Sequence, residues 1–400
     1  MSDPAGRLIR PQDEAAATGR QSWRLGQFYA VSILARSLLI AVIPAIALLR
    51  LGDAGLVSAV YFASSCLTFT ISLALPRVLH RLGLRGILAA GTLSGVLCGL
   101  SFLLPGLAGL VPGLTLHVLM VLCFENASNL AALRLIARRD QPAFEARRVM
   151  LAAPAYMLGP VIGTALQEAG LVGLVFAAAA LCACLAPLLV FMAGRGAAAV
   201  RPAPAAPAAS GFALRGFLSA PRLRAAWLLA VGRAMWWQML FVYTPLMALS
   251  LGEGLAQAGI VVSLASALLL SAPLWARLTR RMGLRRFMIA AYILCGLFAC
   301  LAGVLAQYSF PLFAAAILLS ALGVSAIDSV ANTPFLRAVR PRDAARMVPI
   351  YNTFREVAQI VPAGVYALLL LFAEIRHIFI LTGLSLAAFA WFCRFLPRRG

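Results

Sequence analysis

Four charged side chains interrupt stretches of sequence that are otherwise apolar. They are Arg36, Glu125, Arg233 and Asp328. An ionisable group inside a membrane is costly, so such groups are usually paired or functional. A carboxylate can bind and release a proton when its arginine partner is exchanged, because desolvation favours the neutral form and a nearby arginine favours the charged form. These residues are therefore candidates for coupling solute movement to protons.

Their depths predict how the four charges pair. At about 1.5 Å per helical residue, Arg36 and Glu125 lie roughly 14 Å from the cytoplasmic ends of their segments. Arg233 and Asp328 lie roughly 12 Å deep. We expect one Arg–carboxylate contact in each half of the chain, because pairing relieves much of the cost of burial. The alternative to proton coupling is a fixed structural ion pair.

Polar and aromatic residues near these charges are candidates to line a substrate cavity. The candidates are Asn126, Asn129, Trp236, Trp237, Gln238, Tyr243 and Asn332. An aromatic ring that faces a cavity can stack on an organic substrate or a cation. The alternative is that the rings face lipid or a neighbouring helix. Of the two adjacent tryptophans, one is expected to face inward.

The segments that must position these residues are membrane spans. Hydrophobic residues form 62% of the 400 positions and charged residues 12%, which is typical of a chain that leaves apolar surface in lipid. The apolar runs are continuous rather than alternating, which favours helices over a barrel. Breaks at Gly, Pro and charge clusters give twelve spans: 27–49, 54–75, 86–106, 112–135, 149–167, 169–193, 225–249, 254–276, 287–306, 311–336, 349–373 and 375–396.

The basic residues fix the expected orientation. All 34 are arginine, and the net charge is +21. With this span count, 28 of them lie in the terminal arms and alternate loops, whereas the opposite loops hold only Arg50 and Arg376. Basic loops stay cytoplasmic, so we expect both termini inside, in the plasma (inner) membrane. The dispersal of the arginines among short loops also argues against nucleic-acid binding.

The chain divides into two similar halves. The segment 80–85 (HRLGLR) matches 280–285 (RRMGLR), and Glu125 with Asn129 matches Asp328 with Asn332. A Pro-Ala-rich stretch separates the halves, and Pro favours extended chain there. The expected domains are a cytoplasmic arm (1–25), a six-helix half (26–196), a cytoplasmic linker (197–224), a second six-helix half (225–396) and a tail (397–400).

Twelve spans in a repeated 6+6 arrangement, with basic Gly-containing loops after spans 2 and 8, resemble the major facilitator superfamily (MFS). The loop elements that carry this resemblance are Arg81, Gly83, Arg85, Arg281, Gly283 and Arg285. His80 and Arg280 stand where the family has an acidic residue. Span 5 carries Gly159, Pro160, Gly163 and Thr164, similar to a motif of the family's drug–proton antiporters, or alternatively a proline kink with small residues for packing. Arg355 and Glu356 near the start of span 11 are expected to serve packing or gating.

The resemblance implies an all-α membrane fold and a secondary transporter that works by alternating access. The favoured function is proton-coupled export of a small organic solute, and the alternatives are a proton symporter or a uniporter for a metabolite. A membrane-embedded enzyme would need a catalytic cluster, and a receptor would usually add a soluble domain; the sequence shows neither. We expect no cofactor, no metal and no nucleic acid, with a small-molecule substrate, a proton and the lipid bilayer as partners of a monomer.

The first prediction is that the 197–224 linker is cytoplasmic. In a background without the 8 native cysteines, Ala208→Cys should resist a membrane-impermeant maleimide added to intact cells. Ser309→Cys, in an expected external loop, is the matched control and should react. Labelling of Ala208→Cys from outside would show that the topology is wrong.

Overall fold

The fold is described from a computed structural model. It describes residues 11–136, 141–192, 211–330, 333–339, 347 and 350–396. Within these ranges the chain is helical apart from short connections, and no strand occurs. An all-helical structure follows from the composition, because a helix satisfies its own backbone hydrogen bonds where no water is present.

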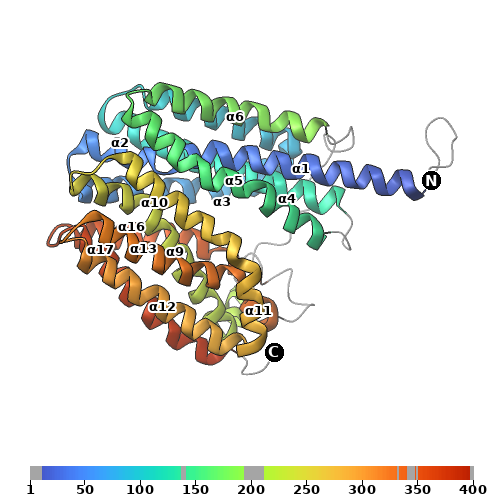
Figure 1. Cartoon of the computed structure of the whole chain (residues 1–400). Coiled ribbons are helices and arrows are strands. Elements are labelled where there is room, and N and C mark those ends of the chain that lie inside the picture. Colours follow the sequence, from blue (N-terminus) through green and yellow to red (C-terminus); the bar gives the residue numbers. More distant parts are fainter. Residues whose placement is uncertain are drawn as a thin grey trace. The chain divides into compact units, whose positions relative to one another are not determined.

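Six helices occur in the described residues before 193 (Figure 1). They are α1 (Pro11–Ile40), α2 (Val42–Leu51), α3 (Ala54–Ser101), α4 (Gly106–Leu135), α5 (Gln141–Glu168) and α6 (Val172–Met192). α1 begins well before the expected span, so most of the arm expected over 1–25 is helical from Pro11 onward. The span expected over 27–49 is divided between α1 and α2, with a break at Ala41.

The remaining helices follow residue 210 (Figure 1). They are α8 (Gly211–Ser219), α9 (Pro221–Ser250), α10 (Leu255–Ala267), η2 (Leu268–Ser271), α11 (Ala272–Met282), α12 (Leu284–Leu305), α13 (Phe310–Ser329), α14 (Thr333–Ala338), α16 (Phe354–Leu369), α17 (Arg376–Phe389) and η4 (Ala390–Phe395). The second part of the expected linker is helical, because α8 and the start of α9 lie within 211–224. Its Pro-Ala-rich first part lies outside the described residues.

Eleven helical segments in the described part of the chain are long and apolar enough to cross a membrane. They correspond to eleven of the twelve expected spans. The remaining one, expected over 349–373, contains α16, which has 16 residues. Helical residues 350–352 precede it and are separated from it by a turn at Thr353. The chain is a multi-pass membrane protein.

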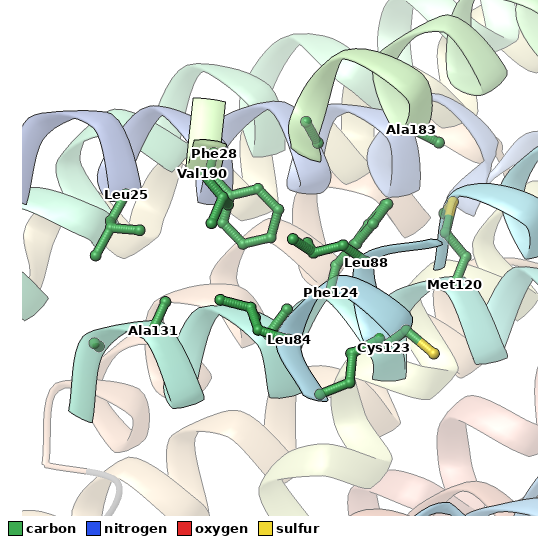
Figure 2. Close-up of a cluster of buried hydrophobic side chains, with 14 of the residues drawn as sticks. Leu25, Phe28, Leu84, Leu88, Met120, Cys123, Phe124, Ala131, Ala183 and Val190 are labelled. Carbon is green, nitrogen blue, oxygen red and sulfur yellow. The ribbon is translucent and has the colours of Figure 1, made fainter. Parts of the chain in front are cut away.

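The described contacts divide the chain into two compact units, each assembled from separate segments. Unit 1 comprises residues 1–39, 70–159 and 173–204, and unit 2 comprises 40–69, 160–172 and 205–400. In unit 1, α1, α3, α4 and α6 enclose a core that includes Phe28, Leu88, Phe124 and Val190 (Figure 2). In unit 2, α12 packs along both α13 and α17, and α9 contacts α10, α16 and α17. α9 and α13 are therefore held in one packed unit.

The two glycines of the repeated loop motif have the same unusual backbone. Gly83, within α3, has φ 64° and ψ −168°. Gly283, between α11 and α12, has φ 79° and ψ 147°. This combination of angles is essentially restricted to glycine. The structure thus explains why both halves carry a glycine at this point of the repeat, since residues with a side chain are strained at these backbone angles.

A substitution tests this requirement. Gly283→Ala should lower the free energy of unfolding by roughly 1–3 kcal/mol, because alanine is strained at positive φ. The matched control is Gly173→Ala in α6, where an added Cβ meets nothing within 4 Å and alanine favours the helix. The measurement is thermal unfolding of the detergent-solubilised protein. Equal stability of the two variants would contradict the assignment.

Candidate functional site

The tighter of the two charged contacts lies in unit 2, between α9 and α13. Arg233 Nη1 lies 2.6 Å from Asp328 Oδ1, and both side chains are largely buried. Trp237 Nε1 donates a hydrogen bond of 2.7 Å to Asp328 Oδ2. Each carboxylate oxygen therefore has its own donor. The predicted contact of Arg233 with Asp328 is confirmed, whereas its role in coupling stays a prediction.

The other aromatic candidates of α9 are buried against neighbouring helices. Trp236 is fully buried and donates from Nε1 to Ser320 Oγ of α13 at 2.8 Å. Tyr243 is buried too, and its hydroxyl lies 2.8 Å from the hydroxyl of Ser58. In this conformation neither ring is available to a substrate. Gln238 is half-buried, and Asn332 lies outside the described residues.

The charged contact of unit 1 is looser. Arg36 of α1 lies 3.8 Å from Glu125 of α4, and the two side chains are 27% and 31% exposed. Among the described residues no hydrogen bond joins them. The predicted contact is confirmed at the distance of an ion pair, but both groups keep hydrogen-bonding capacity for another ligand. The two ion pairs thus lie at equivalent positions of the repeat but differ in how closely their partners are bonded.

A second arginine, which the sequence placed in a loop, joins this cluster. Arg148 of α5 donates to Asn129 Oδ1 at 3.0 Å, and its guanidinium lies 4.6 Å from the ring centroid of Tyr29. Tyr29 and Tyr156 lie in the same cluster, close to Arg36 and Glu125. Arg148 was not among the predicted site residues, because span 5 was expected to begin at residue 149, whereas α5 begins at Gln141. The two tyrosines were not predicted because spacing along a helix does not show which face a side chain occupies.

The remaining asparagine candidate differs from Asn129. Asn126 donates to the carbonyl of Leu122 within α4 at 2.8 Å. This local bond satisfies the amide nitrogen on its own helix. Its side chain is half-buried, and a substrate contact for Asn126 stays a prediction.

Residues in the Gly-Pro motif of α5 lie very close to two other helices, α1 and α10. An ideal Cβ on Gly159 would lie 2.4 Å from Ser37 Cβ of α1, in unit 1. In unit 2, the Thr164 hydroxyl occupies the position of a Cβ on Gly259 of α10. There the Val161 N–H donates to Ser263 Oγ at 3.2 Å. Gly163 is buried in the same turn as Thr164, so these small residues provide close helix packing.

The other motif residues lie outside the charged clusters. The side chains of Arg85 and Arg281 are exposed and that of Arg285 is half-buried, while the side chain of Arg81 is outside the described part. Arg355 is exposed, with its guanidinium 5.6 Å from the centroid of the Phe354 ring. Glu356 is half-buried. Their gating roles stay predictions.

A cavity of about 410 Å³ in unit 2 lies far from the charged contact. Its lining includes Asp53, Ser250, Gln307, Glu374 and Arg376. Ser250 ends α9, 17 residues beyond Arg233, or roughly 25 Å along the helix. Arg376 is already held by Glu374 at 2.8 Å and by Gln307 at 2.8 Å. In the described part of the chain, no group of three His, Cys, Asp or Glu residues could hold a metal ion.

Comparison with known proteins places this architecture. The family model described as Major Facilitator Superfamily matches residues 257–400. The fold is that of the major facilitator superfamily. Among solved structures, a POT family transporter with a thioalcohol-conjugated peptide matches with TM-score 0.68 and 14% identity, over 98% of this chain and 97% of that one. A peptide transporter POT mutant matches with TM-score 0.70 and 16% identity, over 98% and 100%.

A third similar structure is a POT family transporter in complex with 5-aminolevulinic acid, with TM-score 0.68, 14% identity and coverage of 98% and 97%. No curated protein matches the sequence. At these identities the structural likeness establishes the MFS fold alone. The all-α, MFS-type architecture expected from the sequence is thereby confirmed.

The difference between the two charged contacts is measurable. A double-mutant cycle on Arg233→Ala and Asp328→Ala should give a coupling energy of about 1–3 kcal/mol, because the partners are close and hydrogen-bonded. The same cycle on Arg36→Ala and Glu125→Ala should stay below about 1 kcal/mol, as for partly exposed ion pairs. Unfolding of the purified protein in detergent gives both values. A larger coupling in unit 1 would contradict the geometry.

Proposed function

We propose that this MFS protein is a secondary transporter that moves a small organic solute by alternating access, coupled to protons. The observation that carries the proposal is that each unit has an Arg–carboxylate contact between two helices that the sequence assigns to membrane spans, Arg36 with Glu125 and Arg233 with Asp328. Charges at that depth are retained at a cost when they serve transport. Repeated halves are typical of transporter folds, whose substrate sites lie at the interface between repeats. No cofactor or enzymatic step is part of this proposal.

The proton site is proposed to be Asp328. With Arg233 and Trp237 in contact, its carboxylate is stabilised in the charged form. Separation of α9 from α13 would leave the group in apolar surroundings, where the protonated form is favoured. A carrier that alternates between two such conformations binds a proton in one and releases it in the other.

The solute is proposed to carry an anionic group that binds at Arg36. Three features of unit 1 support this: the loose contact with Glu125, the nearby guanidinium of Arg148, and the absence of any hydrogen bond of Arg36 to described residues. A guanidinium suits carboxylates and phosphates because it offers a fork of donors. The solved neighbours contain a peptide derivative and 5-aminolevulinic acid, and the name of the latter specifies both an amino and an acid group.

The proposed direction is export by proton antiport. The close α5–α10 crossing at Thr164 and Gly259 supports it, because the sequence there is similar to an antiporter motif. The neighbour solved with 5-aminolevulinic acid, a small organic acid by its name, favours the second candidate, proton symport of a metabolite. Proteoliposomes with an imposed pH gradient decide between the two: under antiport the solute accumulates on the acidic side, under symport on the alkaline side.

The coupling role makes a specific prediction for Asp328→Asn. The variant should still exchange solute between two equal pools, because solute binding is intact. It should lose accumulation driven by a pH gradient, because the amide binds no proton in this range. Both activities are measured in proteoliposomes with labelled solute.

The matched control is Glu125→Gln, which removes the corresponding carboxylate of unit 1. Gradient-driven accumulation is expected to persist in this variant, with a changed apparent affinity for the solute. If both variants still concentrate solute, neither carboxylate couples transport to protons, and the contacts are structural ion pairs.

A further inference from the structure

The indole of Trp237 has a role that its sequence position did not suggest. Its ring stacks on Phe241, with centroids 5.3 Å apart and an interplanar angle of 25°. It also meets the edge of Trp236 at 5.0 Å. Its Nε1–H donates to Asp328 Oδ2 at 2.7 Å. A ring engaged in this way is poorly placed to stack on a solute.

Trp237 and Arg233 are four residues apart on α9. Residues at this spacing lie on the same face of a helix. α9 therefore presents two donors together, one to each oxygen of the carboxylate on α13. A displacement of α9 along or away from α13 would break both bonds at once, whereas an arginine alone could follow the carboxylate with its long, flexible side chain.

We propose that Trp237 is a positioning residue for the proton site: it holds Asp328 in the charged state and releases it only when α9 and α13 separate. The inference rests on the proposed function, because it treats Asp328 as the coupling carboxylate. A hydrogen bond to a charged acceptor is stronger than one between neutral groups. Loss of the indole donor therefore favours proton binding by Asp328.

The other titratable groups around this site do not compete in the same pH range. Tyr292 and Cys295 of α12 lie close enough to Asp328 to interact with it, and Tyr351 lies close to Arg233. Two arginines are charged here: Arg233, which contacts Asp328, and Arg355, which lies against Phe354. Hydroxyl and thiol groups ordinarily ionise only at alkaline pH, and arginine remains protonated. A proton bound near neutral or acidic pH at this cluster is therefore assigned to Asp328.

The chain itself provides a matched pair of variants. Trp237→Phe keeps an aromatic ring against Phe241 but removes the N–H donor to Asp328. Trp236→Phe removes the neighbouring N–H donor, which binds Ser320 instead. Infrared spectroscopy follows the carboxyl band of Asp328 during a pH titration, with Asp328→Asn identifying that band. Trp237→Phe should bind the proton about tenfold more tightly, which raises the titration midpoint by about one pH unit. Trp236→Phe should leave the midpoint unchanged.

A second measurement uses the intact protein and does not depend on how the variants fold. With indole-¹⁵N tryptophan, the N–H band of the indole bound to Asp328 should change with the same midpoint as the carboxyl band. A midpoint in Trp237→Phe equal to that of wild type would overturn the proposal, as would an N–H band that is constant across the titration.

Transport by the same proteins separates this inference from the proposed function. If wild-type protein shows no proton-driven accumulation, the proposed function fails, while the infrared midpoint still decides what Trp237 does to Asp328. If accumulation is proton-driven and Trp237→Phe shifts neither the infrared midpoint nor the pH profile of transport, only the role of Trp237 is rejected. A shift to higher pH of both the infrared midpoint and the pH profile of transport supports the proposed function and the role of Trp237 together.

Discussion

The cost of placing a charge where little water can reach it governs the functional part of this structure. The Asp328 side chain is only 17% exposed, so its charge must be compensated locally. Arg233 provides the opposite charge and Trp237 the second hydrogen bond. Replacing either donor would leave a carboxylate oxygen unsatisfied, which is expensive in low dielectric. The packing of α9 against α13 is thereby linked to the charge of one side chain.

The same constraint is met differently in the two units. In unit 2 the carboxylate is bonded at both oxygens and largely buried. In unit 1 Arg36 and Glu125 are about one-third exposed and further apart, so hydration can replace part of the compensation. A tightly bonded charge suits a switch with two discrete states, whereas an incompletely bonded arginine suits recognition of an incoming anion. Sequence repetition has therefore produced equivalent positions with divergent properties.

Small residues allow α5 and α10 to pack closely. Where Thr164 meets Gly259, a side chain larger than hydrogen on the glycine would collide with the threonine hydroxyl. Close approach also lets Ser263 accept the N–H of Val161, adding an interhelical bond where an apolar environment offers no hydrophobic driving force. The glycines at 83 and 283 act otherwise: they allow backbone angles that turn one helix into the next.

The sequence by itself determined the helical membrane architecture, the repeat and the pairing of charges. Continuous apolar runs leave a helix as the only plausible span, and a repeat offset places Glu125 and Asp328 at equivalent positions. Depth along a helix follows from residue number alone, which is why the contacts of Arg36 and Arg233 were predictable. The break at Ala41 and the short helix α8 were not predictable, because both depend on local backbone geometry.

Only the tertiary structure decided what each side chain of the clusters does. Two adjacent tryptophans are equivalent by composition, yet Trp236 binds Ser320 and Trp237 binds Asp328. Adjacent residues on a helix differ by about 100° in direction, and the partner that each one meets is set by the rotation of α9 against α13. Arg148 likewise passed for a loop arginine until the packing of α5 brought it to Asn129 and Tyr29. Spacing along the chain determines the position of a residue along the helix axis. The partner that its side chain meets depends on neighbouring helices that are remote in sequence.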